Sequence, residues 1–255
     1  MITLYKYGYP AGVETPGVET PDISPFVVKL ETWLRMSGIP YETRTGTRHD
    51  MPKGKLPAVR IDGQLMADSS SIIAHLQQSD PRALRDTHLD PLQRAQAEAI
   101  KALVESQLYF VGLYQRWCVD VAFARYQPLL IDYAKRSAPA WQRPLVPIVA
   151  PAILPLIRRR MMRQAWQQGI ARHDEDEVLA IGCRGVQALA TLLGHQDYLF
   201  GATPSTVDAS VFGQLHTLVR HPFPGPLQDL ARAQPELMAY HDRIWQRYWS
   251  DFGQA

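Results

Sequence analysis

The sequence predicts an α/β domain over residues 1–80, followed by an all-helical domain over residues 91–255. Strand and helix patterns alternate in the first part, whereas nearly every apolar pattern after residue 91 has a helical period. A polar linker over residues 80–91 separates the two patterns. At 255 residues with 46% apolar side chains, the chain is long enough for two domains that each bury a core.

The α/β domain begins with a β-α-β unit. Apolar and polar side chains alternate over residues 2–7, as in a strand, and a second strand is expected over residues 39–44. Between them, a loop rich in Pro, Gly and Thr over residues 10–22 leads to a helix with Ser24 as its N-cap and Gly38 after its end. The proline that follows Ser24 suits the first helical turn.

A β-hairpin and a helix complete this domain. Proline cannot donate to a β ladder, so Leu56-Pro57 belongs at the beginning or edge of a strand. A turn at Asp62-Gly63 and a second short strand then lead to a helix over residues 69–77. The order β-α-β followed by β-β-α is that of thioredoxin-like domains.

Two features of this hairpin and helix suit an extended peptide ligand. The backbone N–H and C=O of Leu56 can stay free for the main chain of a ligand. Asp68 and Ser69 present a carboxylate, a hydroxyl and the unpaired N–H groups of a helix start. A peptide with an amine at one end and a carboxylate beside it would match both features.

In the helical domain, amphipathic patterns cover residues 91–125, 174–194 and 235–252. Another helix begins at a Ser-x-x-Asp capping pattern formed by Ser205 and Asp208. In this pattern Ser205 accepts from the N–H three residues on, and Asp208 reaches back to the N–H of Ser205. We therefore expect a structural role for Asp208.

Residues 144–157 form an apolar segment that four prolines interrupt and that three arginines follow directly. The segment is too short to span a membrane, so we expect no membrane insertion. A buried or interfacial kinked helix with a solvated basic end is the favoured interpretation. Contact with a membrane surface or a partner protein is the alternative.

Composition and charge exclude several classes of function. A net charge of +2, without a basic run interleaved with aromatic residues, argues against nucleic-acid binding. Cys118 and Cys183 lie far apart, without a CxxC pair or metal-ligand spacing, so we expect neither a disulfide framework nor a metal site. The N-terminus lacks the apolar core of a signal peptide, and a cytoplasmic location is expected.

The chain combines a thioredoxin-like module, which has a Leu-Pro motif and an Asp-Ser helix start, with a helical domain that has a capping box. This combination resembles the glutathione transferase superfamily. Within it, the chain looks most like the metaxin and failed-axon-connections branch and its bacterial relatives. The order and spacing of four segments carry this resemblance: residues 23–32 (ISPFVVKLET), 108–117 (LYFVGLYQRW), 168–173 (QGIARH) and 198–213 (YLFGATPSTVDASVFG).

The resemblance implies a site for glutathione, used as a co-substrate. By family pattern, Leu56 pairs with the cysteinyl backbone beside a cis-Pro57, and Asp68 with Ser69 holds the γ-glutamyl end. A lysine, either Lys55 or the one two residues earlier, meets the glycyl carboxylate, although a solvated lysine fits the same position.

The catalytic position departs from the members that resemble glutaredoxins, in which a cysteine heads the first helix. This chain has Ser24 there. Serine cannot form the mixed disulfide of thiol–disulfide exchange, but its hydroxyl at the positive end of a helix can donate to a bound thiolate. Two alternatives stay open: Ser24 only caps the helix, or a phenol of Tyr7 or Tyr9 is the thiol donor.

The expected function is that of a glutathione transferase-like enzyme that adds the thiolate of glutathione to a small hydrophobic electrophile. Tyr109, Tyr114 and Trp117 are candidate walls of the electrophile pocket, although aromatic residues at this spacing are more often part of a core. Arg116 and Arg172 are candidate partners for an anionic group, or else solvated or salt-bridged side chains. The alternative is a non-catalytic, metaxin-like binding protein, because metaxin-like members act in protein assembly at membranes. Related folds pair as two-fold dimers, so we expect a homodimer.

Overall fold

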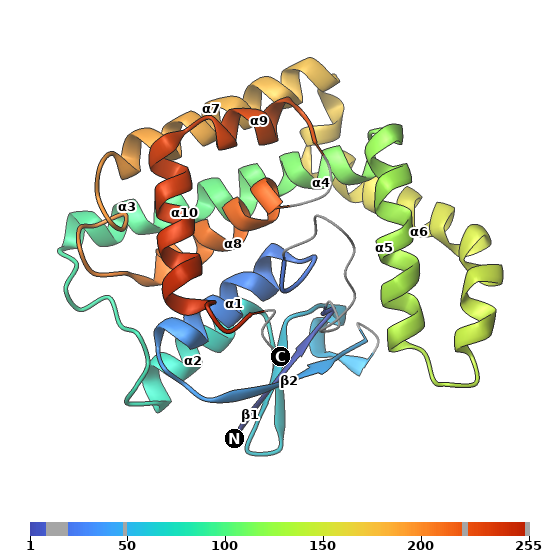
Figure 1. The fold of residues 1–255 in the computed structure, drawn as a ribbon, viewed down its shortest axis with the longest axis horizontal. Helices are drawn as coiled ribbons and strands as arrows, with labels where there is room; N and C mark the ends of the chain where they lie inside the picture. The colour runs from blue at the N-terminus through green and yellow to red at the C-terminus, as the bar shows by residue number, and fades with distance from the viewer. Residues whose placement is uncertain (9–19, 48–49, 221–223, 253–255) are drawn as a thin grey trace.

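The computed structural model describes residues 1–8, 20–47, 50–220 and 224–252 and begins with a four-stranded mixed sheet (Figure 1). The strands lie in the order β2-β1-β3-β4. They are β1 (Ile2–Lys6), β2 (Tyr41–Thr45), β3 (Ala58–Ile61) and β4 (Gln64–Ala67). β1 and β2 are parallel, whereas β1 with β3 and β3 with β4 are antiparallel, which confirms the predicted thioredoxin-like topology.

Two helices, α1 (Pro25–Met36) and α2 (Ser69–Ser79), complete this part of the molecule. Figure 1 shows α1 between the sheet and the C-terminal helices, where it packs along α8. Trp33 of α1 shares a core with the strand residues Leu4 and Val59, whereas Val28 belongs to the core of the helical part. α1 is therefore covered on both sides, and every side chain from Val27 to Leu34 is buried.

The remainder of the described chain is mostly helical, as the periodicity predicts. Its helices are α3 (Pro91–Ala102), α4 (Tyr109–Trp117), α5 (Asp120–Ser137), α6 (Val146–Gln168), α7 (Glu175–Leu193), α8 (Thr206–Arg220), α9 (Pro226–Arg232) and α10 (Pro235–Tyr248). A π-helical turn, η3 (Leu103–Leu108), joins α3 to α4, and shorter 3-10 turns lie at Pro52–Gly54, Arg143–Leu145 and Ile170–Arg172. The single stretch expected over residues 91–125 is interrupted, because the backbone is extended at Val119 and α5 begins anew.

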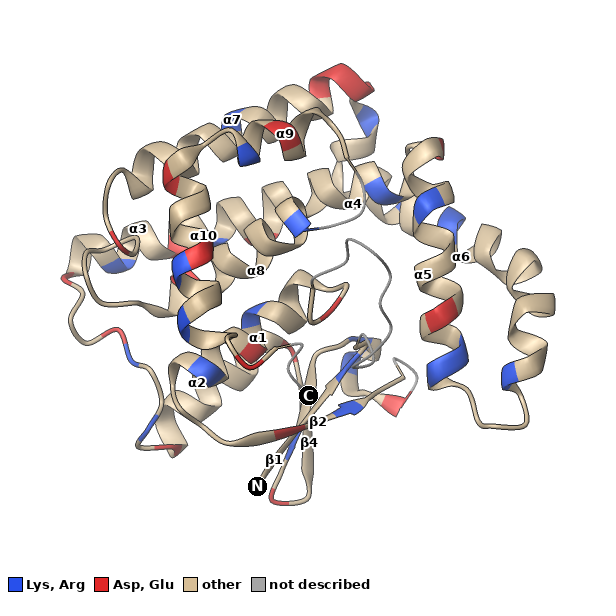
Figure 2. Cartoon of the chain, viewed as in Figure 1, with Lys and Arg blue, Asp and Glu red and all other residues tan. Residues whose placement is uncertain are grey.

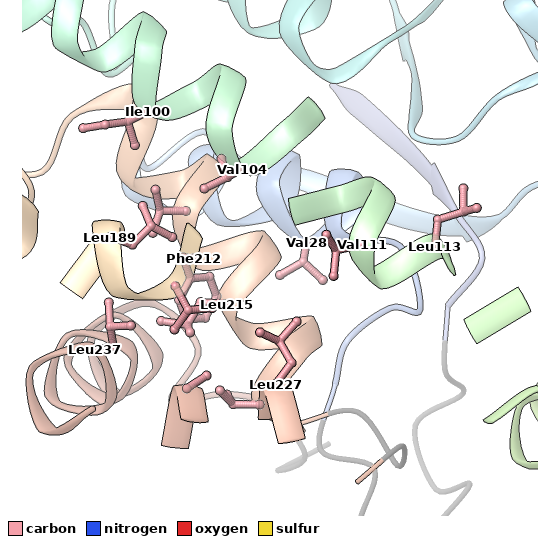
Figure 3. Packing of buried hydrophobic residues seen from close by; sticks show 14 of the residues in the cluster. Val28, Ile100, Val104, Val111, Leu113, Leu189, Phe212, Leu215, Leu227 and Leu237 are labelled. Atoms are coloured by element: carbon pink, nitrogen blue, oxygen red, sulfur yellow. The ribbon is translucent and has the colours of Figure 1, made fainter. Parts of the chain in front are cut away.

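The core of the helical part holds α1 in place (Figure 3). Val28 of α1 lies in this core with Val111 of α4 and Phe212 of α8. Gly213 lets α8 approach closely, since a Cβ atom there would lie 2.5 Å from the carbonyl oxygen of Pro25. The start of α1 is thus fixed against the helical part, while the domain limits at residues 80 and 91 stay a prediction.

The start of α8 contains the predicted acidic cap with one difference. Oδ2 of Asp208 accepts the N–H of Ser205 at 2.7 Å, as expected. The hydroxyl of Ser205 donates to the same carboxylate at 2.6 Å instead of accepting a backbone N–H. The N–H of Leu199 and the hydroxyl of Tyr240 donate to Oδ1 at 3.0 and 3.1 Å, so Asp208 joins three segments and its structural role is confirmed.

The proline-rich segment lies in α6, with Pro151 and Pro155 inside the helix. Leu154 is buried, whereas Ile148 and Leu156 are 74% and 61% exposed. The helix carries four arginines and no acidic residue, so Figure 2 shows blue but no red along it. The helix is therefore partly buried and its arginines are largely exposed, as the favoured interpretation expects, whereas an interface on its exposed side stays a prediction. None of the helices within the described ranges is long and apolar enough to cross a membrane.

The last helix ends earlier than expected, at Tyr248. Trp249 follows it and is 1% exposed, and its indole N–H donates to the hydroxyl of Thr32 in α1 at 3.1 Å. Trp249 therefore packs onto the molecule's own core, next to α1.

Candidate functional site

Ser24 lies directly before α1, at the helix end where backbone N–H groups have no partner within the helix. It is the N-cap, as predicted, and its carbonyl oxygen accepts the N–H groups of Val27 and Val28 at 3.1 Å each. Its hydroxyl makes no capping hydrogen bond. Ser24 instead lines a cavity, where its side chain lies at the positive end of the helix dipole.

Asp22 is the residue of this helix start that sequence analysis missed. It is fully buried, with Oδ1 accepting the N–H of Ser24 at 2.8 Å and Oδ2 accepting the N–H of Gly8 at 2.6 Å. Burial raises the pKa of Asp22 to about 7, although the positive charge of Lys6 and the two N–H donors act in the opposite direction. This carboxyl group therefore ties the chain after β1 to the backbone of Ser24.

The Leu56-Pro57 peptide bond is cis, as the resemblance implies. Both residues are buried, and the ladder between β1 and β3 begins one residue later, where Ala58 lies opposite Tyr5. Leu56 belongs to the same small core as Val27 of α1. The backbone of Leu56 thus lies just outside the ladder, close to the first turn of α1.

Asp68 follows β4 and is the N-cap of α2. Its Oδ1 accepts the N–H and the hydroxyl of Ser71 at 3.0 and 3.1 Å, and its own N–H lies 3.4 Å from the carbonyl oxygen of Pro57. Burial alone would raise the pKa of Asp68, but the hydrogen bonds from Ser71 and the positive charges of Lys53 and Lys29 outweigh it and keep the pKa below its usual value. The half-buried carboxylate is therefore ionised at neutral pH and can hold an amine.

Lys29 connects the starts of α1 and α2 to the helical part. Its side chain is 2% exposed, and its Nζ donates to the hydroxyl of Ser70 at 2.8 Å and to Glu105 of the π-helical turn at 2.7 Å. Burial lowers the pKa of Lys29, and the attraction of Glu105 opposes this shift. A single buried cation thus bridges three segments beside the candidate amine site.

A cavity of about 340 Å³ lies beside Ser24, between the start of α1 and helices α4, α5 and α6. Tyr109 and Trp117 of α4, Leu130 of α5 and Leu154 of α6 contribute to its wall. Figure 1 shows α5 and α6 standing to one side of the rest of the molecule, where they bound this space. The cavity suits a small apolar molecule.

The residues predicted to bind and activate glutathione form two adjoining groups. Residues 56–57 and 68–69 gather where the hairpin meets α2, and Lys55 is exposed beside them. Ser24 lies on the wall of the cavity, and none of the other predicted binding residues is among the described residues that line it. Of the residues predicted to bind or activate glutathione through the peptide or the serine hydroxyl, Ser24 is thus the one that the described cavity wall includes.

Two of the three aromatic residues predicted for the electrophile pocket are among the described residues that line the cavity. Tyr109 and Trp117 line the cavity, but Tyr114 is not among the described lining residues. Tyr7 also lines it, and its ring packs edge-on against Tyr133 with 5.0 Å between the centroids. Tyr9 and residues 10–19 of the loop lie outside the described residues.

Sequence analysis missed the contribution of α5 and α6 to the cavity wall. Ala150, Leu154 and Ile157 recur at helical spacing, which is the signal of an inward-facing stripe. Nothing in the local sequence indicates what lies opposite that stripe, because the opposite wall comes from α1 and α4.

Comparisons with known proteins agree with this geometry. Family models described as glutathione S-transferase N-terminal domain and C-terminal domain match residues 25–122 and 182–244. The isoprene-epoxide–glutathione S-transferase of Rhodococcus sp. (strain AD45) is 30% identical over 97% of this chain and 99% of its own length. The chain belongs to the glutathione S-transferase family. This glutathione S-transferase homologue is also 27% identical to metaxin-2 of Mus musculus, over 89% of the chain and 82% of the relative.

Solved structures show the same fold. A β-etherase from Sphingobium sp. strain SYK-6 superposes with a TM-score of 0.59 at 20% identity, covering 100% of this chain and 99% of that one. A glutathione S-transferase from Methylobacterium radiotolerans, solved with glutathione sulfonate, gives a TM-score of 0.55 at 19% identity, with coverage of 98% and 93%. The predicted glutathione transferase fold and the resemblance to its metaxin branch are confirmed.

Proposed function

We propose that the protein binds glutathione, activates its thiol with the hydroxyl of Ser24 and adds the thiolate to a small apolar electrophile. The observation that carries this proposal is the position of Ser24. It stands at the start of α1, without a side-chain capping bond, on the wall of a cavity of about 340 Å³. A thiolate held there would face both a hydrogen-bond donor and a space for its reaction partner.

The first half of the site has groups that match the ends of glutathione. The backbone of Leu56, just outside the ladder, can pair with the cysteinyl residue. The ionised carboxylate of Asp68 suits the γ-glutamyl amine, because no described residue donates to its Oδ2. The exposed ammonium of Lys55 can meet the glycyl carboxylate.

The energy needed to form the thiolate is within reach of Ser24 and α1. Lowering the pKa of a thiol from about 8.5 to about 7 requires about 2 kcal/mol of differential stabilisation. A hydrogen bond to a charged group contributes about 1.5–3 kcal/mol, and a helix N-terminus about 0.3–1 kcal/mol. Neither Cys118 nor Cys183 is among the described lining residues, so glutathione supplies the only thiol that this proposal uses.

The test is the pKa of the bound glutathione thiol, followed by the ultraviolet absorbance of the thiolate in the wild type, Ser24→Ala and Tyr7→Phe. We expect Ser24→Ala to raise that pKa by about one unit, about 1.4 kcal/mol, and Tyr7→Phe to leave it unchanged. The reverse pattern would assign the donor role to the phenol. A wild type that binds no glutathione at millimolar concentration in isothermal titration calorimetry would end the proposal.

The second candidate function is a non-catalytic binding protein. The similarity to metaxin-2 and the exposed apolar side chains of α6, such as Ile148 and Leu156, favour it. Absence of glutathione binding in the same titration would support this function over the first. A cytoplasmic homodimer stays a prediction in both cases, and light scattering of the purified protein checks the dimer.

A further inference from the structure

The hairpin that α5 and α6 form, residues 120–168, exposes large apolar side chains. Trp141, in the turn between the two helices, is 72% exposed, and Leu145, Ile148 and Leu156 are 49%, 74% and 61% exposed. None of these four side chains, the apolar patch of the hairpin, is among the described residues that line the cavity beside Ser24. Figure 1 shows the hairpin standing to one side of the molecule, so the patch lies at its periphery.

The apolar patch and the cavity use different faces of α6. Leu145, Ile148, Ala152 and Leu156 follow one another at spacings of three or four residues, which places them on one face of the helix. All four are exposed, whereas Leu154, which lines the cavity, is buried. The cavity therefore accounts for the inner face of α6 but not for its apolar outer face.

Arginines continue the outer face toward the C-terminal end of α6. Arg159 and Arg163 follow Leu156 by three and seven residues, and both are exposed. Among the described residues no carboxylate forms an ion pair with either arginine, whereas Arg158 lies 2.6 Å from Asp120. The outer face thus passes from apolar to unpaired basic side chains along the helix.

The positive charge of the chain is concentrated in this hairpin. Residues 120–168 contain eight basic and two acidic side chains, a net charge of +6. The rest of the chain contains 19 basic and 23 acidic side chains, a net charge of −4. Figure 2 shows blue segments along both α5 and α6. This separation of charge turns the hairpin, with its apolar patch, toward an anionic surface.

We propose that the outer face of the hairpin docks the protein on an anionic membrane surface, with the apolar patch among the lipid headgroups and Arg159 and Arg163 on lipid phosphates. Tryptophan is enriched at this depth of a bilayer, which suits Trp141 in the exposed turn. Basic side chains beside an apolar patch add attraction to anionic lipids. The helix lies in the interface without crossing the bilayer. This inference goes beyond the proposed enzymatic function and does not depend on glutathione binding.

A lipid surface fits this face better than a second copy of the chain or an acidic protein. A two-fold contact between copies would bring the arginines of both outer faces together. Pro151 and Pro155 each remove one hydrogen bond from the helix, and the carbonyl oxygens concerned belong to the exposed Pro147 and Pro151. Such oxygens need water, which the headgroup region supplies and a dry protein interface does not.

The test is co-sedimentation of the purified protein with vesicles of phosphatidylcholine that contain about 30% phosphatidylserine, beside vesicles of phosphatidylcholine alone. We expect the wild type to bind the anionic vesicles about tenfold or more tightly than the neutral ones. Arg159→Gln combined with Arg163→Gln should weaken binding about 30-fold, since each arginine near such a surface contributes about fivefold. Ile148→Ser combined with Leu156→Ser should weaken it about tenfold.

The matched control lies in α3, where Leu92 is 67% exposed and Arg94 is exposed as well. Leu92→Ser combined with Arg94→Gln removes the same kinds of side chain from another helix, and we expect it to change vesicle binding less than about twofold. All the substituted residues are exposed, so each variant should keep the circular dichroism spectrum of the wild type.

A wild type that does not sediment with the anionic vesicles would overturn the inference, as would an equal loss in the α3 control. Loss of binding in the arginine variant alone would refute the apolar contact and favour a purely ionic one, such as that with an acidic protein. A dimer in light scattering that Ile148→Ser combined with Leu156→Ser converts to a monomer would, without vesicle binding, assign the outer face to a second copy. The titration with glutathione tests the proposed function separately, whichever result the vesicles give.

Discussion

The starts of α1 and α8 each hold a buried aspartate, but the two carboxyl groups differ in how they are satisfied. Asp208 accepts two backbone N–H groups and two hydroxyls, from Leu199, Ser205 and Tyr240. Asp22 accepts two backbone N–H groups, and no described hydroxyl donates to its carboxylate. Burial raises the pKa of both. Two equally buried carboxyl groups therefore have different roles. Asp208 stabilises the packing of the helical part, whereas Asp22 is a titratable group that is hydrogen-bonded to the backbone of Ser24.

The largest effect on stability is expected at Asp208, because its carboxylate accepts more hydrogen bonds than that of Asp22. Asp208→Ala leaves the N–H groups of Leu199 and Ser205 and the hydroxyl of Ser205 buried without their acceptor, and each such group costs about 1–3 kcal/mol. We expect the free energy of unfolding to fall by about 3 kcal/mol or more, measured with urea. Asp174→Ala is the control, because it removes an exposed capping box and should cost about 1 kcal/mol. Equal losses in the two variants would contradict the comparison.

The second effect is a dependence of stability on pH that Asp22 introduces. Its pKa is about 7 in the folded protein against 3.8 in the reference state, so over this range the folded protein holds a proton that the unfolded chain has released. Stability from this group is therefore present at low pH and is lost as pH rises from about 4 to about 7, at up to about 1.4 kcal/mol per unit. We expect Asp22→Asn to remove this slope in urea unfolding between pH 5 and pH 8. The control is Asp62→Asn, in the exposed turn, which should keep the wild-type dependence of stability on pH. If Asp22→Asn also kept that dependence, the group that titrates would be a residue other than Asp22.

A third aspartate, Asp68, sharpens the comparison, because it lies at a helix start but is only half buried. We expect Asp68→Ala to weaken glutathione binding about tenfold in isothermal titration calorimetry, or about 1.4 kcal/mol, as the γ-glutamyl amine loses its carboxylate. Ser71→Ala removes a hydroxyl that donates to this carboxylate without removing the carboxylate itself, and should change the affinity less. An affinity unchanged by Asp68→Ala would show that the amine is held elsewhere.

The smallest effect is expected at Lys55. An exposed ammonium contributes about 0.5 kcal/mol to an ion pair in water, so Lys55→Ala should weaken glutathione binding about twofold. The loss should shrink further in concentrated salt, which screens exposed charges. A loss as large as that of Asp68→Ala would mean that the lysine becomes buried when glutathione binds.

The local features that the structure confirms have signals in nearby residues of the sequence. The Leu-Pro pair predicted a strand opening, and the Ser-x-x-Asp pattern predicted Asp208, since both depend on residues within a few positions of one another. The contact of Asp22 with Ser24 is local, but its second partner, Gly8, lies 14 residues away across a loop, and the burial that results from this contact has no local signal. The cavity wall could not be predicted from the sequence either, because it forms only where α4, α5 and α6 pack near the start of α1.

The buried ammonium of Lys29 makes the two halves of the molecule dependent on each other's sequence. It originates in α1, and its ionic partner Glu105 belongs to the π-helical turn of the helical part. Removing one member of a buried ion pair commonly costs about 3–5 kcal/mol. A chimaera that joins this α/β half to the helical half of a relative without an acid at that position would therefore leave the ammonium of Lys29 buried without its ionic partner, and we expect it to be less stable. Exchange of the two halves among homologues should preserve stability only when both the lysine and the glutamate are present.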